Sequence, residues 1–276
     1  MRAEQYWRAA LDRSRQAATS GDLAPLSTER LELPGCEPFV LRRLLGLPPR
    51  HLREPGPRPN PFLPWERPLE VSRLGEEHLL LLNKYPVQEG HLLLITQNWW
   101  PQSGWLNACD WQAVADVTAD TGGLWFFNSS SVAGASQPHR HLQLLPRPSG
   151  QPSCPLAAEL IAQLEGKSAS WPWAYRLERR GGLTGGALRA LYERHCHSLG
   201  LGSPGLNPRP RHPYNLLFDD DWFLTIRRVR EHGAGFSVNA LGFAGYLLLT
   251  GRSDLDWLRA NGPLRLLQEV AAPSVA

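Results

Sequence analysis

The sequence predicts an α+β fold in which a largely antiparallel sheet is flanked by helices. Short apolar runs with strand character come in neighbouring groups, and segments with helical spacing lie between the groups. Helices do not separate each pair of strands, which argues against a doubly wound parallel sheet. With 276 residues, 42% of them hydrophobic and 20% charged, the chain is long enough to bury a sizeable core.

The N-terminal part is expected to hold a helix followed by a long loop. The first twenty residues have helical spacing and end at Gly21, a typical helix stop. Residues 48–68 contain eight prolines, which exclude a helix or a central strand and predict an extended loop. Four arginines lie in that loop, so it is either a surface linker or a cationic cover over an anionic ligand: Arg50, Arg53, Arg58 and Arg67.

The remaining elements follow in two groups of strands. Between the strands of the first group, Asp110 is predicted to be the N-cap of a short helix that ends in glycine. The first group of strands is expected at 78–82, 92–96, 124–128 and 139–145. Helices are expected at 155–166 and 186–199, further strands at 214–218, 222–227 and 243–249, and a last helix at 254–271.

Composition excludes several classes of protein. A net charge of +3 is far from the basic excess of a dedicated nucleic-acid binder, although it allows a local polyphosphate pocket. No apolar run approaches the roughly 20 residues of a membrane helix, and the N-terminus lacks a signal-peptide block, so a cytoplasmic protein is expected. Four scattered cysteines without a C-x-x-C pair indicate buried thiols.

Residues 136–146, SQPHRHLQLLP, are the most specific segment. In a strand His139, His141 and Gln143 project from one side, at successive steps of about 7 Å, while Arg140, Leu142 and Leu144 point to the other. A metal site would use the same two histidines, but the local pattern lacks a third ligand. A purely structural role suits a single histidine better than this whole polar face, which must lie beside a cleft or solvent.

The residues before this strand favour phosphate binding. The stretch 128–137, NSSSVAGASQ, is rich in small and hydroxyl side chains, so its backbone N–H groups and Ser136 could converge on phosphate oxygens; the alternative is a flexible turn. Of the 29 cationic side chains only Lys84 and Lys167 are lysines. A retained lysine can serve as a compact charge on phosphate, although chance explains either one equally well.

The segment GASQPHRHLQ resembles the active-site motif of the ATP adenylyltransferases, or diadenosine tetraphosphate (Ap4A) phosphorylases, in the histidine-triad (HIT-like) superfamily. The segment NKYP at 83–86 with the strand after it, YNLL at 214–217 and NALGFAG at 239–245 are similar to further motifs of that family, in the same order. The resemblance implies one HIT-like nucleotidyltransferase domain over 1–276, with a catalytic core at about 60–150 and a C-terminal segment at about 205–276. One departure is Thr250, where the family often has lysine.

Carried over by residue, the resemblance implies that His141 is the nucleophile, flanked by His139 and Gln143. Nucleotide or phosphate contacts are implied for Asn83, Lys84, Asn128, Gly134, Ala135, Ser136, Gln137, Asn239, Ala240 and Leu241. His141 would attack the α-phosphorus of Ap4A and expel ATP, after which phosphate would release ADP. A hydrogen bond from one ring nitrogen to a backbone carbonyl would fix the tautomer.

The implied partners are small molecules: Ap4A, ATP, ADP and phosphate, with no nucleic acid and no membrane. No tightly bound cofactor or protein metal site is expected; Mg²⁺ would come with the polyphosphate. The oligomeric state is left open.

Several alternatives stay open. A hexose-1-phosphate nucleotidyltransferase usually has H-P-H and structural-metal cysteines, and a dinucleoside polyphosphate hydrolase usually has a further histidine in place of Gln143. A noncatalytic nucleotide-binding protein would keep the pocket without the chemistry. An interaction module would use exposed tryptophans, with Trp99-Trp100 and the WPW segment 171–173 as candidates.

Overall fold

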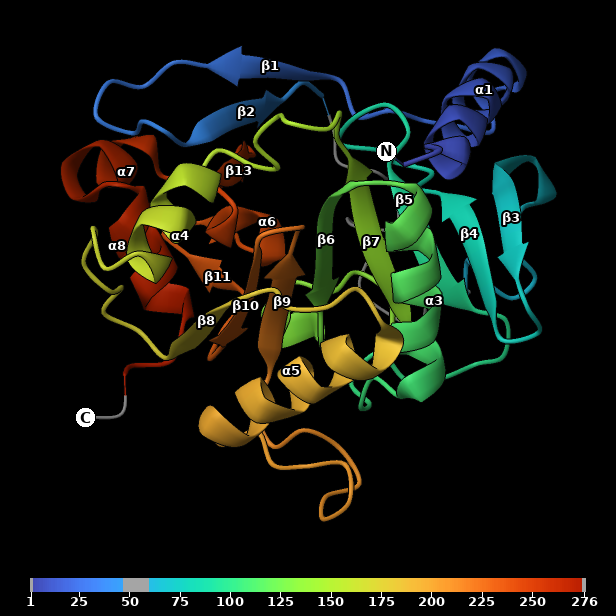
Figure 1. The fold of residues 1–276 in the computed structure, drawn as a ribbon. Helices are drawn as coiled ribbons and strands as arrows, with labels where there is room; N and C mark the ends of the chain where they lie inside the picture. Colours follow the sequence, from blue (N-terminus) through green and yellow to red (C-terminus); the bar gives the residue numbers. More distant parts are fainter. Residues whose placement is uncertain (1, 47–59, 275–276) are drawn as a thin grey trace.

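The computed structural model describes residues 2–46 and 60–274 (Figure 1). Its centre is an eight-stranded sheet in the order β3-β4-β5-β7-β6-β9-β10-β8, and every neighbouring pair is antiparallel. The predicted α+β fold with a largely antiparallel sheet is therefore confirmed. The strands are β3 (Glu70–Leu74), β4 (His78–Leu82), β5 (Leu92–Thr96), β6 (Gly123–Asn128), β7 (His141–Pro146), β8 (Tyr175–Arg179), β9 (Tyr214–Phe218) and β10 (Trp222–Arg227).

Helices cover both faces of this sheet (Figure 1). On one face α3 and α5 pack side by side over alternate strand residues such as Leu142 and Leu144, with α1 beside them. On the other face lie α4, α6, α7, α8 and a small sheet in the order β1-β2-β13. The helices are α1 (Gln5–Ser20), α3 (Ala108–Asp120), α4 (Ala157–Leu164), α5 (Gly185–Ser198), α6 (Ala240–Phe243), α7 (Leu255–Asn261) and α8 (Pro263–Val270). The remaining elements are β1 (Thr28–Leu31), β2 (Val40–Leu44), β11 (His232–Gly233), β12 (Phe236–Ser237), β13 (Tyr246–Leu249) and the 3-10 turns η1 (Arg67–Leu69) and η2 (Ser131–Ala133).

The interior strands match their predicted positions, because each is a run of apolar residues buried on both sides. The predicted strands at 78–82, 92–96, 214–218 and 222–227 are correct to the residue. The edge strands β3 and β8 were not predicted. Their sequences, EVSRL and YRLER, carry charges that suit an exposed sheet edge and hide the strand pattern.

Three predicted boundaries are wrong for local reasons. The N-cap of α3 is Asn107, and Asp110 is the third helical residue that closes a capping box with it. The last helix is divided into α7 and α8 at Gly262, which has a φ of 77° and is followed by proline. The strand predicted at 243–249 begins only at Tyr246, because its first residues belong to α6 and to the turn at Gly245.

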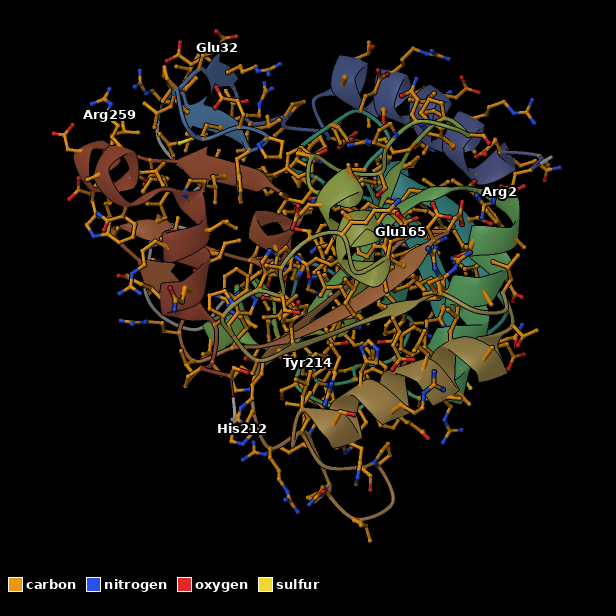
Figure 2. The ribbon with its side chains drawn as sticks, turned by 60° about the vertical axis from the view of Figure 1, so that its left-hand side comes forward. Arg2, Glu32, Glu165, His212, Tyr214 and Arg259 are labelled. Carbon is orange, nitrogen blue, oxygen red and sulfur yellow. The ribbon has the colours of Figure 1, made fainter. Side chains whose placement is uncertain are left out.

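The face that carries α6 is apolar at both ends and polar in the middle. One apolar cluster there includes Phe126 and Leu217, and a separate one includes Leu93 and Ile95. Between them lie polar side chains from β6, β7 and β9, all on this face by strand alternation. Figure 2 shows the charged Arg2, Glu32 and Arg259 at the periphery and Tyr214, which is fully buried, in the interior.

Parts of the predicted loop at 48–68 can be assessed. Residues 60–66 form turns without a helix or an extended strand, as expected, whereas Arg67 and Pro68 at the end of the predicted loop belong to the short 3-10 turn η1. Arg50, Arg53 and Arg58, which suggested a cationic cover, lie outside the described residues. Within the described ranges no helix has the length and apolar character needed to cross a membrane. The proposed division into a core at about 60–150 and a segment at about 205–276 stays a prediction.

Candidate active site

His141 is the first residue of β7 and is held at both ring and backbone. Its Nδ1 lies 2.8 Å from the carbonyl oxygen of His139. A carbonyl oxygen only accepts, so Nδ1 carries the proton, which confirms the predicted tautomer-fixing bond. Burial lowers the pKa of His141 to about 4, and the ring is therefore neutral near pH 7. The unprotonated Nε2 makes no hydrogen bond to any residue that the structure describes, so it is free to act as a nucleophile.

The predicted alternation of side chains along residues 139–144 is confirmed. Phe62 contacts the rings of both His139 and His141, with centroids 5.5 Å apart in each case. On the opposite side Arg140 donates to Asp110 at 2.9 Å, and this carboxylate also accepts from His78 at 2.9 Å. The guanidinium charge is thus paired on the face opposite His141.

His139 has a fixed tautomer as well. Its Nε2 donates to the carbonyl oxygen of Thr96 at 2.8 Å, and its Nδ1 accepts from the Asn60 amide at 2.9 Å. Desolvation lowers the pKa of this imidazole too. With both ring nitrogens engaged, His139 is suited to hold Phe62 and the backbone in place, while His141 keeps a free lone pair.

Gln102 takes the place of a strand partner beside His141. The strand was predicted to begin at residue 139, but β7 begins two residues later, at His141, because regular pairing of β7 with β6 stops at Gln143. The Gln102 side chain fills the gap: its Oε1 accepts from the His141 N–H at 2.8 Å, and its amide donates to the carbonyl oxygens of Asn128 at 2.7 Å and His141 at 3.2 Å. Gln102 is only 2% exposed, so these bonds are shielded from water.

The loop of small residues within 128–137 lies in contact with the α6 segment. Gly134 has a φ of 87°, and a Cβ there would lie 2.6 Å from the Cβ of Asn239. Asn239 caps α6 through the N–H of Leu241, and Asn128 Oδ1 accepts from the N–H of Ala240 at 2.9 Å. Asn128 therefore joins the sheet to α6, a structural role beyond the nucleotide contact expected of it. Ala135 and Ser136 lie on the same loop, half-buried and exposed.

Two polar atoms of this loop region are buried without a partner among the described residues: Ser130 Oγ and Gln137 Oε1. Buried polar atoms are normally hydrogen-bonded, so unpaired ones beside a candidate site are available to a ligand.

Arg228 is a buried cation behind this loop that the sequence analysis did not single out. Its guanidinium donates to Asn215 Oδ1 and to the carbonyl oxygens of Val238 at 2.8 Å and Val270 at 3.1 Å. Desolvation lowers its pKa to about 9, which still leaves it charged near pH 7. No salt bridge to Arg228 occurs within the described part of the chain. Its charge is thus bound by dipoles and remains available to attract an anion.

Asn83 and Lys84 lie on the loop between β4 and β5. Asn83 hydrogen-bonds His91 at 3.2 Å, and His91 in turn contacts Gln143 Oε1 at 3.0 Å. The Lys84 ammonium lies 2.7 and 2.8 Å from the two carboxylate oxygens of Glu66. Asn83 is thereby connected through His91 to Gln143 of the H-x-H-x-Q motif. Lys84, whose side chain is 37% exposed, has a carboxylate as its described partner.

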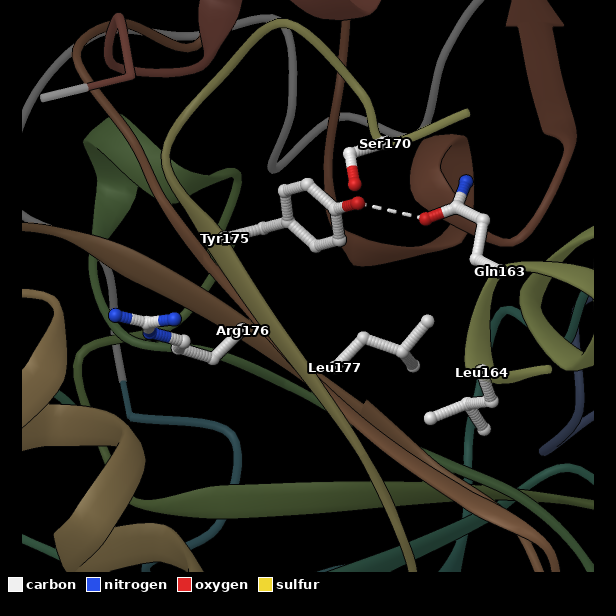
Figure 3. A pocket seen from close by; sticks show the side chains of 6 residues that line it. All are labelled: Gln163, Leu164, Ser170, Tyr175, Arg176 and Leu177. Carbon is white, nitrogen blue, oxygen red and sulfur yellow. Dashed lines mark hydrogen bonds between the residues drawn. The ribbon is translucent and has the colours of Figure 1, made fainter. Parts of the chain in front are cut away.

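Other features of the chain offer fewer groups that could bind a ligand or react. A hollow of about 340 Å³ between α4 and β8 is lined by Gln163, Tyr175 and Arg176, and Tyr175 donates to Gln163 at 2.6 Å (Figure 3). Trp99 and Trp100 are exposed, and Arg140 lies over the Trp100 ring, whereas the tryptophans of the WPW segment are buried. Three cysteines are buried as predicted, but Cys109 is exposed. Within the described residues no cluster of three metal-ligating side chains occurs.

Sequence reasoning missed Gln102, His91 and Arg228 for different reasons. Gln102 precedes the helix by several residues and shows no pattern of its own. His91 directly follows the NKYP segment and its turn, so a polar residue at the head of an otherwise apolar strand was the available signal. Arg228 is one of 27 arginines and only its burial distinguishes it.

Comparison with protein-family models assigns the chain to a family. The model of the Ap4A phosphorylase N-terminal domain matches residues 1–162, and that of the ATP adenylyltransferase C-terminal domain matches residues 169–273. The first match covers more than half of the chain. This protein belongs to the Ap4A phosphorylase family of nucleotidyltransferases, and strands from both matched segments share its large sheet.

Two curated relatives come from Saccharomyces cerevisiae. Diadenosine 5',5'''-P1,P4-tetraphosphate phosphorylase 2 is 34% identical over 83 residues, or 26% of each chain, and Protein APA1 is 33% identical over 81 residues, or 27% of this chain and 25% of the relative. The aligned part thus spans about a quarter of these relatives' length. The crystal structure of yeast Ap4A phosphorylase Apa2 has a TM-score of 0.76 at 21% identity over the whole of both chains, and its complex with Ap4A one of 0.72 at 19% identity over 98% of each. These two structures show the shared fold.

Replacing Gln102 should slow chemistry at His141 more than it weakens binding. In Gln102→Ala the backbone of the nucleophile loses its fixed partner, and misplacement by about 1 Å can cost on the order of 100-fold. We expect kcat to fall about 10- to 100-fold with KM changed less than threefold, and Gln102→Glu to lie between, because it keeps only the acceptor.

Gln97→Ala is the matched control, since the Gln97 amide also donates to two backbone carbonyls, of Gly75 and His78. It should lower the unfolding temperature without lowering kcat. An equal loss of kcat in both variants would show that Gln102 has no special role.

Proposed function

We propose that the chain is an ATP adenylyltransferase that converts Ap4A and phosphate to ATP and ADP, reversibly, through an adenylyl group on His141. The observation that carries this proposal is the free, unprotonated Nε2 of a neutral histidine whose Nδ1 is fixed by a carbonyl 2.8 Å away. A histidine prepared in this way is a nucleophile that needs no separate base. Family membership supplies the substrate class.

In the first step Nε2 of His141 attacks the α-phosphorus of Ap4A. A nitrogen–phosphorus bond forms, the bond to the bridging oxygen breaks, and ATP leaves with the electron pair of that bond. The ring becomes more positive as it is adenylylated, which strengthens the Nδ1–H bond to the His139 carbonyl. The buried Arg228 behind the loop contributes positive potential to the region where phosphate charge develops.

In the second step a phosphate oxygen attacks the same phosphorus and the nitrogen–phosphorus bond breaks. ADP is released and His141 regains its lone pair. Phosphate is already an anion near pH 7 and needs no general base, whereas water must lose a proton as it attacks. Gln143 cannot accept that proton, so the arrangement favours phosphate over water.

The nucleotide contacts follow the family motifs. We assign the phosphates to the loop that holds Gly134, Ala135, Ser136 and Gln137, and the nucleoside to the region of Asn239, Ala240 and Leu241. Lys84 and Asn83 line the same site from the β4–β5 loop, and Mg²⁺ belongs to the polyphosphate as it binds. Because all four cysteines are free thiols, we also propose a reducing compartment, the cytoplasm.

Product analysis tests the proposed reaction. With Ap4A and phosphate the protein should release ATP and ADP in equal amounts, and without phosphate it should release at most one equivalent of ATP per site. His141→Ala should abolish turnover while nucleotide binding largely survives. Phosphate-independent release of AMP would make the chain a hydrolase, and UDP-sugar products would place it with the hexose-1-phosphate enzymes.

The two lysines provide a matched pair for testing phosphate contact. Lys84→Arg should lower kcat/KM for Ap4A at least about 10-fold, because the planar head is larger than the ammonium that it replaces. Lys167→Arg should change little, since that side chain is 72% exposed and pairs with Glu165. Equal tolerance of both substitutions, measured as kcat/KM, would remove Lys84 from the site.

Formation of adenylyl-His141 should be nearly independent of pH above about 5. The neutral ring is the nucleophile, and burial lowers its pKa to about 4, so the reactive form persists well below the ordinary histidine value of 6.5. Single-turnover labelling with Ap4A in the absence of phosphate measures this step alone. A loss of half the rate near pH 6.5 would contradict the assigned environment of His141.

Stability should fall over the same acidic range and must be followed in parallel. The folded pKa values of His141 and His195 are about 4, and that of His91 about 3, while the unfolded values lie near 6.5. As pH falls below 6.5 the unfolded chain takes up protons that the folded chain does not, which favours unfolding. Short reaction times separate the rate of labelling from this loss of folded protein.

A further inference from the structure

A line of hydrogen bonds leads from the β4–β5 loop to Gln143, and its direction is fixed by a backbone group. The N–H of Tyr85 donates to Asn83 Oδ1 at 3.0 Å. A backbone N–H can only donate, so this oxygen is the acceptor and the Asn83 amide nitrogen is the donor that faces His91. That nitrogen lies 3.2 Å from His91 Nδ1. The orientation of the Asn83 amide follows from the chain itself.

The next step fixes the tautomer of His91. Its Nδ1 faces the Asn83 amide nitrogen and, at 3.5 Å, the backbone N–H of Val87. Two donors directed at one nitrogen require it to be unprotonated. Complete burial lowers the pKa of His91 to about 3, so the ring is neutral and its single proton is on Nε2. That proton points at Gln143 Oε1, 3.0 Å away.

The orientation of the Gln143 side-chain amide follows from this contact with His91. Its carbonyl oxygen accepts a hydrogen bond from His91, so its NH2 group points away from His91 and keeps both N–H donors. Gln143 lies two residues after His141 on the same face of β7 and is half-buried. A phosphate oxygen beside His141 would therefore meet a donor. If the amide were reversed, it would meet a carbonyl oxygen, which repels the anion.

We propose that Asn83 and His91 are positioning residues that hold the Gln143 amide as a hydrogen-bond donor to a non-bridging oxygen of the phosphoryl group transferred to His141. This inference rests on the proposed function and adds a task for side chains outside the H-x-H-x-Q motif. Asn83 then acts through His91, beyond the direct nucleotide contact that the family resemblance implies.

The hydrogen bonds from Asn83 through His91 to Gln143 form a relay, and Asn83→Asp tests its direction with a near-isosteric change. A carboxylate at 83 can only accept, so it would favour the His91 tautomer whose Nδ1–H donates to it and whose Nε2 is unprotonated. The Gln143 amide would then turn its nitrogen to His91 and its oxygen to the phosphate. We expect kcat to fall about 100-fold with little change in KM, at the lower end of the roughly 100- to 1,000-fold loss that follows removal of one donor to a developing oxyanion. Asn83→Ala should have a smaller effect.

A carboxylate at 83 could also repel the substrate directly, and a second background separates the two causes. In Gln143→Ala the relay has no end point, so Asn83→Asp should cost less than about threefold there, whereas direct repulsion would persist at full size. Multiplicative effects of the two substitutions would overturn the relay.

His91 is tested by rescue. His91→Phe removes the donor to Gln143 and should lower kcat about 10-fold or more, while His91→Gln, which offers an amide donor and an acceptor, should recover most of it. His195→Phe is the matched control, because His195 is another buried histidine, which packs from α5 against Phe223. It should lower the unfolding temperature but leave kcat unchanged. If His91→Gln is no better than His91→Phe, the proposal is wrong.

A readout independent of activity keeps this inference separate from the proposed reaction. Nitrogen-15 chemical shifts of His91 should show the Nε2–H tautomer at pH 7 in the wild type and the Nδ1–H tautomer in Asn83→Asp. A wild-type Nδ1–H tautomer would overturn the relay whatever reaction the protein catalyses. Conversely, AMP as the main product would overturn the reaction while leaving the assigned relay intact.

Discussion

The hydrogen bond from His141 Nδ1 to the His139 carbonyl oxygen determines much of what surrounds it. It fixes which nitrogen is free, and its acceptor is a backbone carbonyl two residues earlier in the chain, just before β7 begins. Regular pairing with β6 ends two residues further on, so the His141 N–H needs a substitute partner, which Gln102 supplies. An unpaired buried N–H would cost roughly 1–3 kcal/mol. The fixed orientation of the His141 ring and the hydrogen bonds from Gln102 to the His141 backbone therefore occur together where regular sheet pairing ends.

Two buried arginines, Arg140 and Arg228, have partners of different kinds. This difference affects the electrostatic potential on the two sides of the sheet. Arg140 faces the helices and is neutralised by Asp110, which also closes the capping box of α3. Arg228 lies on the side of the sheet that carries His141 and is bound by Asn215 and by carbonyl oxygens, with Glu231 acting only at longer range. The paired cation stabilises the scaffold. The cation bound by dipoles gives the side of the sheet that carries His141 a positive potential in a poorly solvated region.

The sequence was sufficient for whatever depends on periodicity, and insufficient where one side chain replaces a backbone partner. Interior strands such as β4 and β5 are apolar runs with clear ends, and the alternation from His139 to Gln143 follows from strand geometry alone. The same pattern cannot show that residues 139 and 140 lie outside the ladder, because Gln102 comes from 39 positions earlier. The direction of the Asn83 amide likewise depends on the turn at Tyr85, which exists only in the folded chain. Gly134 illustrates a middle case: its small size suggested a phosphate loop, but its contact with Asn239 is a long-range fact.

The relay behind Gln143 also bears on the choice between phosphate and water. A glutamine that could rotate freely would at times present its carbonyl oxygen, and an oxygen acceptor beside the adenylylated histidine could orient a water molecule for attack. With Oε1 engaged by His91, Gln143 presents donors, which suit the oxygens of an incoming phosphate and give water no acceptor there. In the proposed reaction, selectivity for phosphate thus need not come only from the absence of a base at position 143. It is reinforced by an anchored amide, whose orientation is set by a backbone N–H on another loop.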